Sequence, residues 1–438
     1  MIAYADIPME ADLPALVRVM GLRVRMDETR PPTHRAATIL DTPDARLLSW
    51  GITLSHQISH GVSNWRLQAP TWEPWLPADA AESASDGEVP MRFADMIRPF
   101  RRSGLLGPLA DVTTSSEYLV GEAPDGHRPL LISDHEVVAR QGGPKPIEFR
   151  TLTVTFDDVA LADDLVAAVE EARGTVSAQS RSLGSRLGRR SHIESRTLFN
   201  EALPMPAFVV ALTELRWREL LQAHVSSRGS KDDQAVAAVL TRLRGDVTGL
   251  AAHLLPAWVE RVLSLLDGAL AARPPLYTSG KYYLVLDDLE LTTQNPIAVA
   301  VPNEQGCGSV LRQEVERLVH EAADASRVLT DRSPDTQWMT AAHATARAAS
   351  LLEATGPLFG EESRQARKAL GRVLAAQWAC VAPDEVSRRE IAQLGSAEAF
   401  ERGRTYERAV QLMAGQRALY LEDARGLWRK VMKRQVRP

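Results

Sequence analysis

The chain has 438 residues, of which 45% are hydrophobic and 24% charged, and its formal net charge is −5. This length and composition suit two or three globular domains and exclude a chain dominated by disorder. The 51 Lys and Arg residues are nearly balanced by 56 Asp and Glu residues. A nucleic-acid-binding protein relies on clustered positive charge, so that class is disfavoured.

Several features predict a protein without a membrane partner. The longest apolar stretches, such as 254–266, meet charges or prolines well before the roughly 18 residues that a spanning helix needs. The N-terminal segment 1–12 is acidic rather than basic, which is not typical of a signal peptide. Cys307 and Cys380 are too few for a disulfide framework or a zinc cluster. We therefore expect a cytoplasmic location.

The first 190 residues mainly predict strands. Residues 53–59 and 65–68 form a candidate hairpin over a loop at His60 and Gly61, and the turn at 124–126 joins strands at 116–122 and 129–140. Residues 149–156 alternate, with Thr151, Thr153 and Thr155 on one face and Leu152, Val154 and Phe156 on the other. A helix is predicted at 162–173 and an exposed loop at 77–90. Four tryptophans are expected to lie in a core: Trp50, Trp65, Trp72 and Trp75.

After about Arg190 the apolar residues recur at helical spacing. The pattern predicts helices at 207–225, 232–252, 254–272, 281–289, 309–328, 336–354, 362–380 and 396–435, which two antiparallel helical halves would accommodate.

Four segments carry a resemblance to a known family. They are Ile39–Leu54, Asn64–Gln68, Phe149–Thr155 and Ser180–Gly188. In their order and spacing they resemble the CYTH superfamily of triphosphate tunnel enzymes. The helical remainder is similar to the CHAD domain that commonly follows CYTH in bacterial proteins, through Lys281–Tyr283, Trp338–Gly360 and Leu427–Lys430. The resemblance implies an α+β protein, with an antiparallel β tunnel or barrel over residues 1–190 and an all-α helical bundle over residues 200–438.

The chain departs from the chemistry that the CYTH resemblance implies. Tunnel enzymes bind triphosphate with inward Arg and Lys residues and hold Mg²⁺ or Mn²⁺ with carboxylates. In this chain, neutral or weakly basic residues stand at most of those positions: Tyr4, Ser55, His56, Gln57, Gln68, Thr151, Thr153, Thr155 and Ser182. Losing one residue that binds the phosphates costs on the order of 10²- to 10³-fold in the rate of the catalysed reaction. We therefore expect no catalytic residues and no cofactor.

The CHAD resemblance implies a basic face that suits polyphosphate, and this face is also reduced. Gln234 and Met339 stand near the two histidine positions, while Arg242, Arg244 and Arg347 remain. These arginines, with His56 and Arg66 in the first half, are the candidate phosphate-binding residues. The alternative, which their spacing on helices favours, is that the three arginines are solvated helix residues paired with acids such as Asp246 or Glu353. Similarly, the cluster Arg181, Arg186, Arg189 and Arg190 is either an anion contact or a basic linker.

The leading hypothesis is a non-catalytic CYTH-CHAD-like binding or scaffold protein, with an unknown protein or polyphosphate as its partner. One rival is an active metal-dependent triphosphatase or adenylate cyclase that holds Mg²⁺ or Mn²⁺ with Asp134 and Glu136, which share a strand face, aided by Asp111 and Glu117. In that rival, His56 and Arg66 contact phosphate. Another rival is polyphosphate binding by the helical half through its residual arginines.

Overall fold

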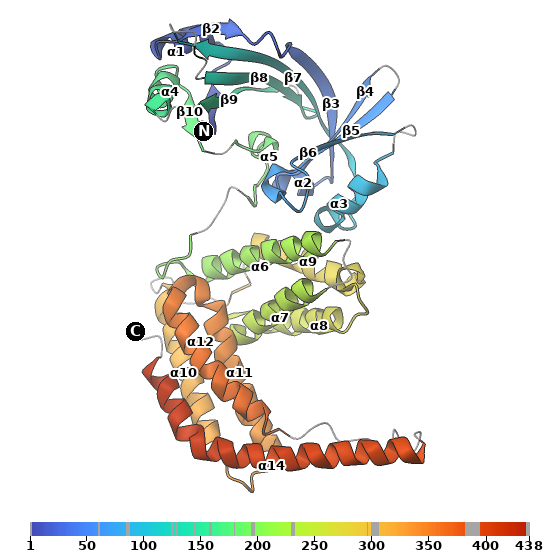
Figure 1. Ribbon diagram of the computed structural model, residues 1–438, viewed down its shortest axis with the longest axis vertical. Coiled ribbons are helices and arrows are strands. Elements are labelled where there is room, and N and C mark those ends of the chain that lie inside the picture. The colour runs from blue at the N-terminus through green and yellow to red at the C-terminus, as the bar shows by residue number, and fades with distance from the viewer. Residues whose placement is uncertain are drawn as a thin grey trace. The chain divides into compact units, whose positions relative to one another are not determined.

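A computed structural model describes residues 2–59, 62–84, 88–123, 127, 130–143, 145–156, 160–178, 180–193, 198–228, 233–295, 297–298, 306–381 and 395–434. The chain divides into two compact units, Met1–Arg196 and Thr197–Pro438 (Figure 1). The first contains an antiparallel sheet and the second is helical, which confirms the α+β class. The predicted loops at 60–61 and 124–126 lie outside the described residues. Across the described ranges, no helix has the length and apolar character needed to cross a bilayer.

One ten-stranded sheet forms the first unit, and its paired strands are antiparallel. The strands are β1 (Ile2–Ile7), β2 (Arg23–Met26), β3 (Thr33–Asp41), β4 (Thr53–Ser59), β5 (Val62–Gln68), β6 (Asp79–Ala84), β7 (Gly107–Glu122), β8 (Leu130–Arg140), β9 (Ile147–Phe156) and β10 (Thr175–Ser177). Their order is β10-β1-β9-β8-β7-β3-β4-β5-β6, and β2 pairs with β7 outside this path.

The sheet is not closed, so the prediction of a tunnel or barrel is wrong in this respect. The two ends of the strand order are β10 and β6, and no pairing joins them among the described residues. Strand β10 has three residues and β6 has six, so neither edge offers a long ladder for closure. Short edge strands are a common way to end a sheet.

The main core of this unit lies on one face of β1, β9 and β8. Helices α1 (Leu13–Val19) and α4 (Ala160–Glu171) pack there through residues such as Leu16 and Val169. On β9, Leu152, Val154 and Phe156 are buried in this core, whereas the threonines between them are partly exposed. The predicted alternation is therefore confirmed, and it leaves the opposite face of these strands polar.

A second, smaller cluster lies on the opposite face, toward the other end of the strands. Helices α2 (Arg46–Ser49) and α5 (Leu183–Arg186) pack against β7, β8 and β9 through Leu48, Leu183 and Leu187. The carboxylate of Asp41 holds α2 in place by accepting backbone N–H groups of Leu47 and Leu48, each at 2.9 Å. These bonds satisfy donors at the start of a helix that would otherwise be unpaired.

Residues 77–90 are not wholly a loop, because β6 pairs with β5 across this stretch. The segment is rich in Ala, Ser and Glu, which are poor strand formers. Backbone hydrogen bonds to β5 therefore decide its conformation. Helix α3 (Met91–Arg101) follows and was not predicted. Three of the four tryptophans lie in the core as expected, and Trp75 is 40% exposed.

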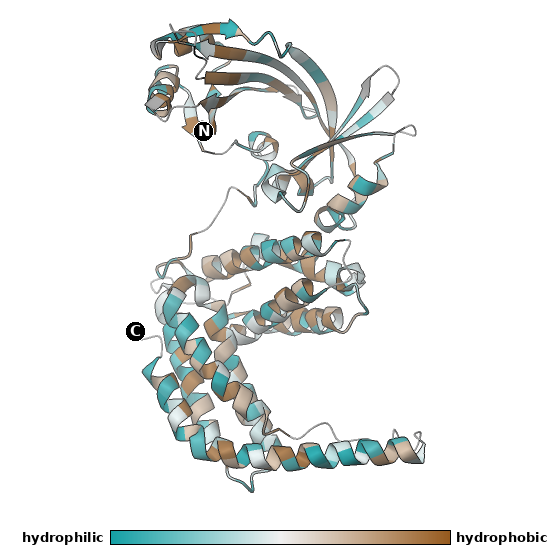
Figure 2. Ribbon diagram, in the orientation of Figure 1, coloured by the Kyte–Doolittle hydropathy of each residue, from teal (hydrophilic) through white to brown (hydrophobic). Residues whose placement is uncertain are grey.

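The second unit consists of α6 (Met205–Ser227), α7 (Gln234–Gly249), α8 (Pro256–Leu270), α9 (Gly280–Gln294), α10 (Cys307–Arg327), α11 (Asp335–Ala354), α12 (Gly356–Trp378) and α14 (Ser396–Lys433). The predicted helices are all present, with shifted ends. Helices α6 to α9 pack on one another, and α10, α11, α12 and α14 pack in sequence. Apolar residues run along α6, α7 and α8 in Figure 2.

Helices α7 and α11 join these two groups of helices. A Cβ atom added at Gly249 would lie 2.5 Å from the backbone nitrogen of Leu351, so the two backbones meet at a glycine. At Gly245, one turn earlier, an added Cβ would be 3.4 Å from the Ser350 hydroxyl, which is ordinary contact. Close approach of these helices therefore depends on one particular residue.

Candidate functional site

The polar face of the sheet is the first candidate site. We call it the hydroxyl face, because cross-strand pairing aligns a set of small hydroxyl side chains there. Thr151 and Thr153 on β9 lie beside Asp6 and Tyr4 on β1, and beside His135 and Ser133 on β8. The hydroxyl face consists of Tyr4, Asp6, Thr33, Thr114, Ser116, Tyr118, Ser133, His135, Thr151, Thr153 and Thr155.

The hydroxyls on β9 have no intramolecular partner among the described residues. Thr151, Thr153 and Thr155 are each partly exposed, and no hydrogen bond joins their Oγ1 atoms to another described residue. A hydroxyl buried in a protein core normally forms a hydrogen bond to another group of the protein. These three hydroxyls are instead available to water or to a ligand.

One ordered hydrogen bond crosses the centre of this face. The Ser116 hydroxyl lies 2.8 Å from Nδ1 of His135. Burial lowers the pKa of His135 from its ordinary value, opposed by the nearby Asp134 carboxylate, which favours the neutral form of the ring. A neutral ring and a hydroxyl can each donate or accept a hydrogen bond, which suits a polar ligand of either kind.

On the same side of the sheet as the hydroxyl face, two carboxylates are paired with arginines. They are Asp6 on β1 and Asp79 on β6, which lie toward opposite ends of the strand order. Arg186 of α5 donates to Asp6 at 2.5 Å, while its guanidinium lies 4.6 Å from the centre of the Phe149 ring. Beyond β3, Arg66 on β5 binds Asp79 on β6 through two hydrogen bonds, one of them 2.6 Å long. Arg186 therefore has a defined partner, and neither Asp6 nor Asp79 is left as an open metal ligand.

The structure does not bring together His56 and Arg66, the two candidate phosphate-binding residues of the first unit. Ser55 faces Arg66 across β4 and β5, whereas His56 faces Trp65 on the other side of the sheet. The His56 ring lies 4.4 Å from the Trp65 ring. Because successive strand residues point to opposite faces, a ligand bound on one side cannot contact both.

Asp134 and Glu136 share a strand face, as predicted, but an arginine occupies the space between them. Arg150 binds Asp134 at 2.6 Å, lies 3.7 Å from Glu136 and donates to the carbonyls of Met9 and Ala11. This cluster lies on the side of α1 and α4, away from the hydroxyl face. Over the described ranges, no group of three or more His, Cys, Asp or Glu residues is placed to hold a metal ion.

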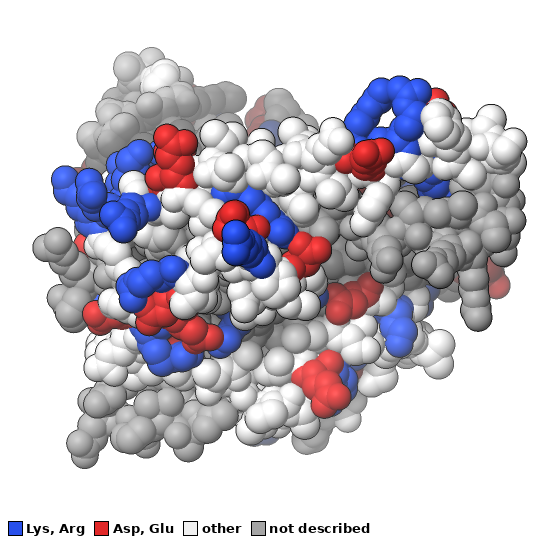
Figure 3. Space-filling view, turned by 90° about the horizontal axis from the view of Figure 1, so that it is seen from below, with Lys and Arg blue, Asp and Glu red and all other residues white. Residues whose placement is uncertain are grey.

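The candidate arginines of the helical unit each bind a carboxylate and do not converge. Arg242 contacts Glu219 at 3.1 Å and Glu353 at 3.2 Å. Arg244 contacts Asp267 at 2.6 Å and Arg347 contacts Glu321 at 3.3 Å. The expected Glu353 pair is therefore present. In the face of the molecule drawn in Figure 3, basic and acidic groups likewise lie beside one another.

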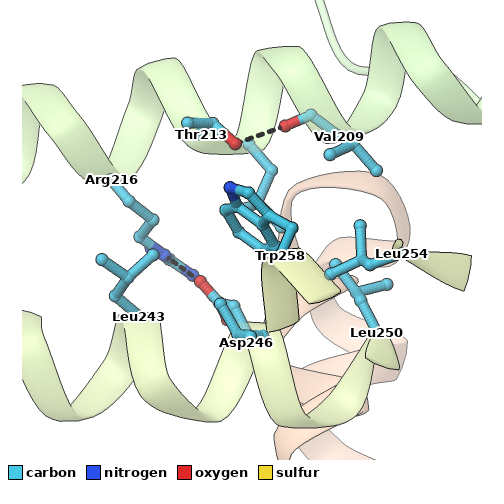
Figure 4. Close-up of a pocket in the computed structure, with 10 residues that line it drawn as sticks. Val209, Thr213, Arg216, Leu243, Asp246, Leu250, Leu254 and Trp258 are labelled. Carbon is cyan, nitrogen blue, oxygen red and sulfur yellow. Dashed lines mark hydrogen bonds and ion pairs between the residues drawn. The ribbon is translucent and has the colours of Figure 1, made fainter. Parts of the chain in front are cut away.

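Sequence reasoning missed a buried ion pair inside the helical unit. Arg216 of α6 binds Asp246 of α7 at 2.5 Å, and both side chains are almost fully buried. They line a cavity of about 20 Å³ between α6, α7 and α8, together with Thr213 and Trp258 (Figure 4). A cavity of this size holds a single water molecule. The buried Nε1 of Trp258 has no hydrogen-bond partner among the described residues.

No protein-family model and no curated protein sequence matches this chain. Among solved structures, the chain is similar to "PptA from Streptomyces chartreusis", with 14% sequence identity and a TM-score of 0.32. The match covers 52% of this chain and 99% of that chain. A similarity this low assigns neither a family nor a function.

Proposed function

We propose that the protein is a non-catalytic binding module of the CYTH-CHAD type, whose hydroxyl face holds a hydrogen-bonding ligand of low charge. The supporting observation is the set of partly exposed threonine hydroxyls on β9, which form no hydrogen bond within the described part of the chain. The cross-strand neighbours of Thr151 and Thr153 are Asp6, Tyr4, His135 and Ser133, rather than a cluster of cations. Such a face can form several hydrogen bonds but cannot neutralise a strongly anionic ligand.

The arrangement of carboxylates also favours binding over catalysis. Metal-assisted phosphoryl transfer needs carboxylates that are free to coordinate Mg²⁺ or Mn²⁺. Asp6, Asp79 and Asp134 each form an ion pair with an arginine. A metal ion would have to displace that arginine and leave its charge uncompensated.

Of the two proposed partner classes, a protein or other low-charge ligand is better supported than polyphosphate. A polyanion would have to compete with the carboxylates that already bind Arg242, Arg244 and Arg347. Arg35 on β3, opposite Thr114, is exposed and forms no ion pair among the described residues, so this side of the sheet offers one cation to a small anion such as inorganic phosphate, far fewer than a polyanion needs.

Hydrolysis assays with tripolyphosphate, ATP and thiamine triphosphate, each with Mg²⁺ or Mn²⁺, test the absence of catalysis. We expect no turnover above a protein-free control. Metal-dependent turnover that disappears in Asp134→Asn or Glu136→Gln would establish the metal-dependent enzyme instead, because those residues are its candidate ligands.

Thermal-shift titrations test the binding proposal, with inorganic phosphate, tripolyphosphate, long-chain polyphosphate and neutral oligosaccharides as probes. We expect saturable stabilisation by inorganic phosphate or a neutral probe, and its loss in the triple variant Thr151→Val, Thr153→Val, Thr155→Val. The matched control is Thr113→Val, which lies on the opposite face of β7. Saturable, salt-weakened binding of long-chain polyphosphate alone would overturn the proposal.

A further inference from the structure

Two carboxylates beside the hydroxyl face set the charge that this side of the sheet presents to a ligand. We call Asp6 and Asp79 the pairing acids, because each binds an arginine. Figure 1 shows the sheet curving toward the side on which α2 and α5 lie. The cluster under these helices includes Val112 of β7, which alternates in the same register as Thr114 and Ser116 of the hydroxyl face. The hydroxyl face is therefore on the inner side of this curve.

The first pairing acid belongs to the hydroxyl face itself. Asp6 on β1 lies opposite Thr151 on β9. Its carboxylate accepts a hydrogen bond from Arg186 at 2.5 Å, and Arg181 lies 3.8 Å away. The guanidinium of Arg186 also lies 4.6 Å from the centre of the Phe149 ring, and its side chain is only 8% exposed. The pair leaves little of the Arg186 charge for a ligand.

The second pairing acid holds an arginine that lies near the same face. Arg66 on β5 binds Asp79 through two hydrogen bonds, one of them 2.6 Å long. The hydrogen bonding to Asp79 raises the pKa of Arg66, and a smaller electrostatic contribution comes from Tyr118 of the hydroxyl face. Arg66 is therefore close to Tyr118, although β5 and β7 are not adjacent in the sheet.

These ion pairs act differently on charged and on neutral ligands. Arginine and carboxylate form strong, directional pairs through parallel hydrogen bonds. A polyanion that took over either arginine would leave a carboxylate without its partner, next to further negative charge, which is unfavourable. A neutral ligand carries no such penalty, because it can bond to the hydroxyls while both ion pairs stay intact.

We propose that the pairing acids determine the ligand specificity of the hydroxyl face: they hold Arg66 and Arg186 in ion pairs and so prevent polyanions from binding. The inference rests on the proposed function, since it assigns the low-charge preference of that face to two particular residues. Arg35, which forms no ion pair among the described residues, stays available to a single small anion.

Isothermal titration calorimetry of the full chain with tripolyphosphate, without divalent metal, tests the proposal. The double variant Asp6→Asn, Asp79→Asn removes both negative charges and keeps the shape of the side chains. We expect it to bind tripolyphosphate at least about tenfold more tightly than wild type, with an affinity that falls as the salt concentration rises. Adding Arg66→Gln should reverse part of this gain. An affinity equal to that of wild type would overturn the proposal.

The matched control is the double variant Glu148→Gln, Glu171→Gln, which changes the net charge by the same amount on the opposite side of the sheet. Glu148 shares a face of β9 with Leu152, and Glu171 ends α4, which packs on that face. Both are exposed and form no ion pair with described residues. The control should bind tripolyphosphate no more tightly than wild type. An equal gain in the control would refute the proposal, because it would show an effect of net charge alone.

A single variant guards against a loss of folding. Asp6→Asn leaves the nearly buried Arg186 without its carboxylate, which is costly. Asp79→Asn affects a pair whose side chains are 35% and 41% exposed, so it should show part of the gain with an unchanged circular dichroism spectrum. The proposed function fails separately, if the triple threonine variant binds inorganic phosphate and the neutral probes as wild type does.

Discussion

Asp246 is the residue whose environment makes the clearest prediction about pH. Burial between α6 and α7 raises its pKa to about 6, from an ordinary value of 3.8, and Arg216 only partly offsets this effect. The folded protein therefore binds a proton more tightly than the unfolded chain does between about pH 4 and pH 6. This carboxyl contributes stability at low pH, and the contribution is lost as the pH rises through the folded pKa.

The prediction is that wild type, measured relative to Asp246→Asn, is about 1 kcal/mol more stable at about pH 5 than at about pH 7.5. Chemical denaturation of both proteins, followed by helical circular dichroism at the two pH values, gives this difference. The asparagine cannot titrate, so the comparison removes the pH dependence of all other groups. A difference that stays constant or grows with pH would contradict the assignment.

Asp41 shows how much one residue in the sequence can specify. It belongs to the segment that carries the CYTH resemblance, and its carboxylate accepts backbone N–H groups of Thr42, Leu47 and Leu48. Its role in the fold is to hold the short helix α2, rather than to contact a ligand. The sequence of this segment therefore meets a local folding requirement.

The two faces of strand β9 have different roles: one packs in the core and the other is part of the candidate binding site. Its inward residues Leu152, Val154 and Phe156 fill the core, while the hydroxyls of its threonines form no hydrogen bond to the residues that the structure describes. The triple Thr-to-Val variant should therefore change the free energy of unfolding by no more than about 1 kcal/mol, because no hydrogen bond is lost and valine favours strands. Leu152→Ala, on the other face, should destabilise by about 2–5 kcal/mol. Urea denaturation compares them, and a large loss in the triple variant would show that the hydroxyls serve the fold.

The contact between α7 and α11 makes a second prediction at this scale. Gly249→Ala places a methyl group 2.5 Å from the Leu351 backbone nitrogen, so the helices must separate, at a cost of about 1–3 kcal/mol. Gly245→Ala meets only ordinary contact and should be neutral or stabilising by up to about 1 kcal/mol through helix propensity. Thermal unfolding of both variants tests this, and equal effects would show that the close approach is not limiting.

At the scale of the whole molecule, the chain contains two compact units with separately buried cores. Calorimetry should resolve two unfolding transitions, because chains built from several domains commonly depart from two-state behaviour. Leu152→Ala should lower one midpoint and Gly249→Ala the other. A single transition that both variants shift equally would show that the units unfold together.

The local pattern of the sequence determined the α+β class, the alternation of β9 and the presence of the main C-terminal helices. Each depends on side-chain periodicity over a few residues, which the chain carries wherever it folds. The sequence also showed that hydroxyls stand where the CYTH resemblance implies charges, and the structure aligns Thr151 and Thr153 with the polar residues of β1 and β8.

Only the tertiary structure decided which groups meet. It placed His56 and Arg66 on opposite faces of the sheet. It also paired Arg150 with Asp134 and Glu136, and it buried the ion pair between Arg216 and Asp246. It also left the sheet open and made β6 a strand despite its composition. Ion pairs and sheet edges join residues that are distant in sequence, so they depend on strand order and helix packing, which local periodicity does not encode.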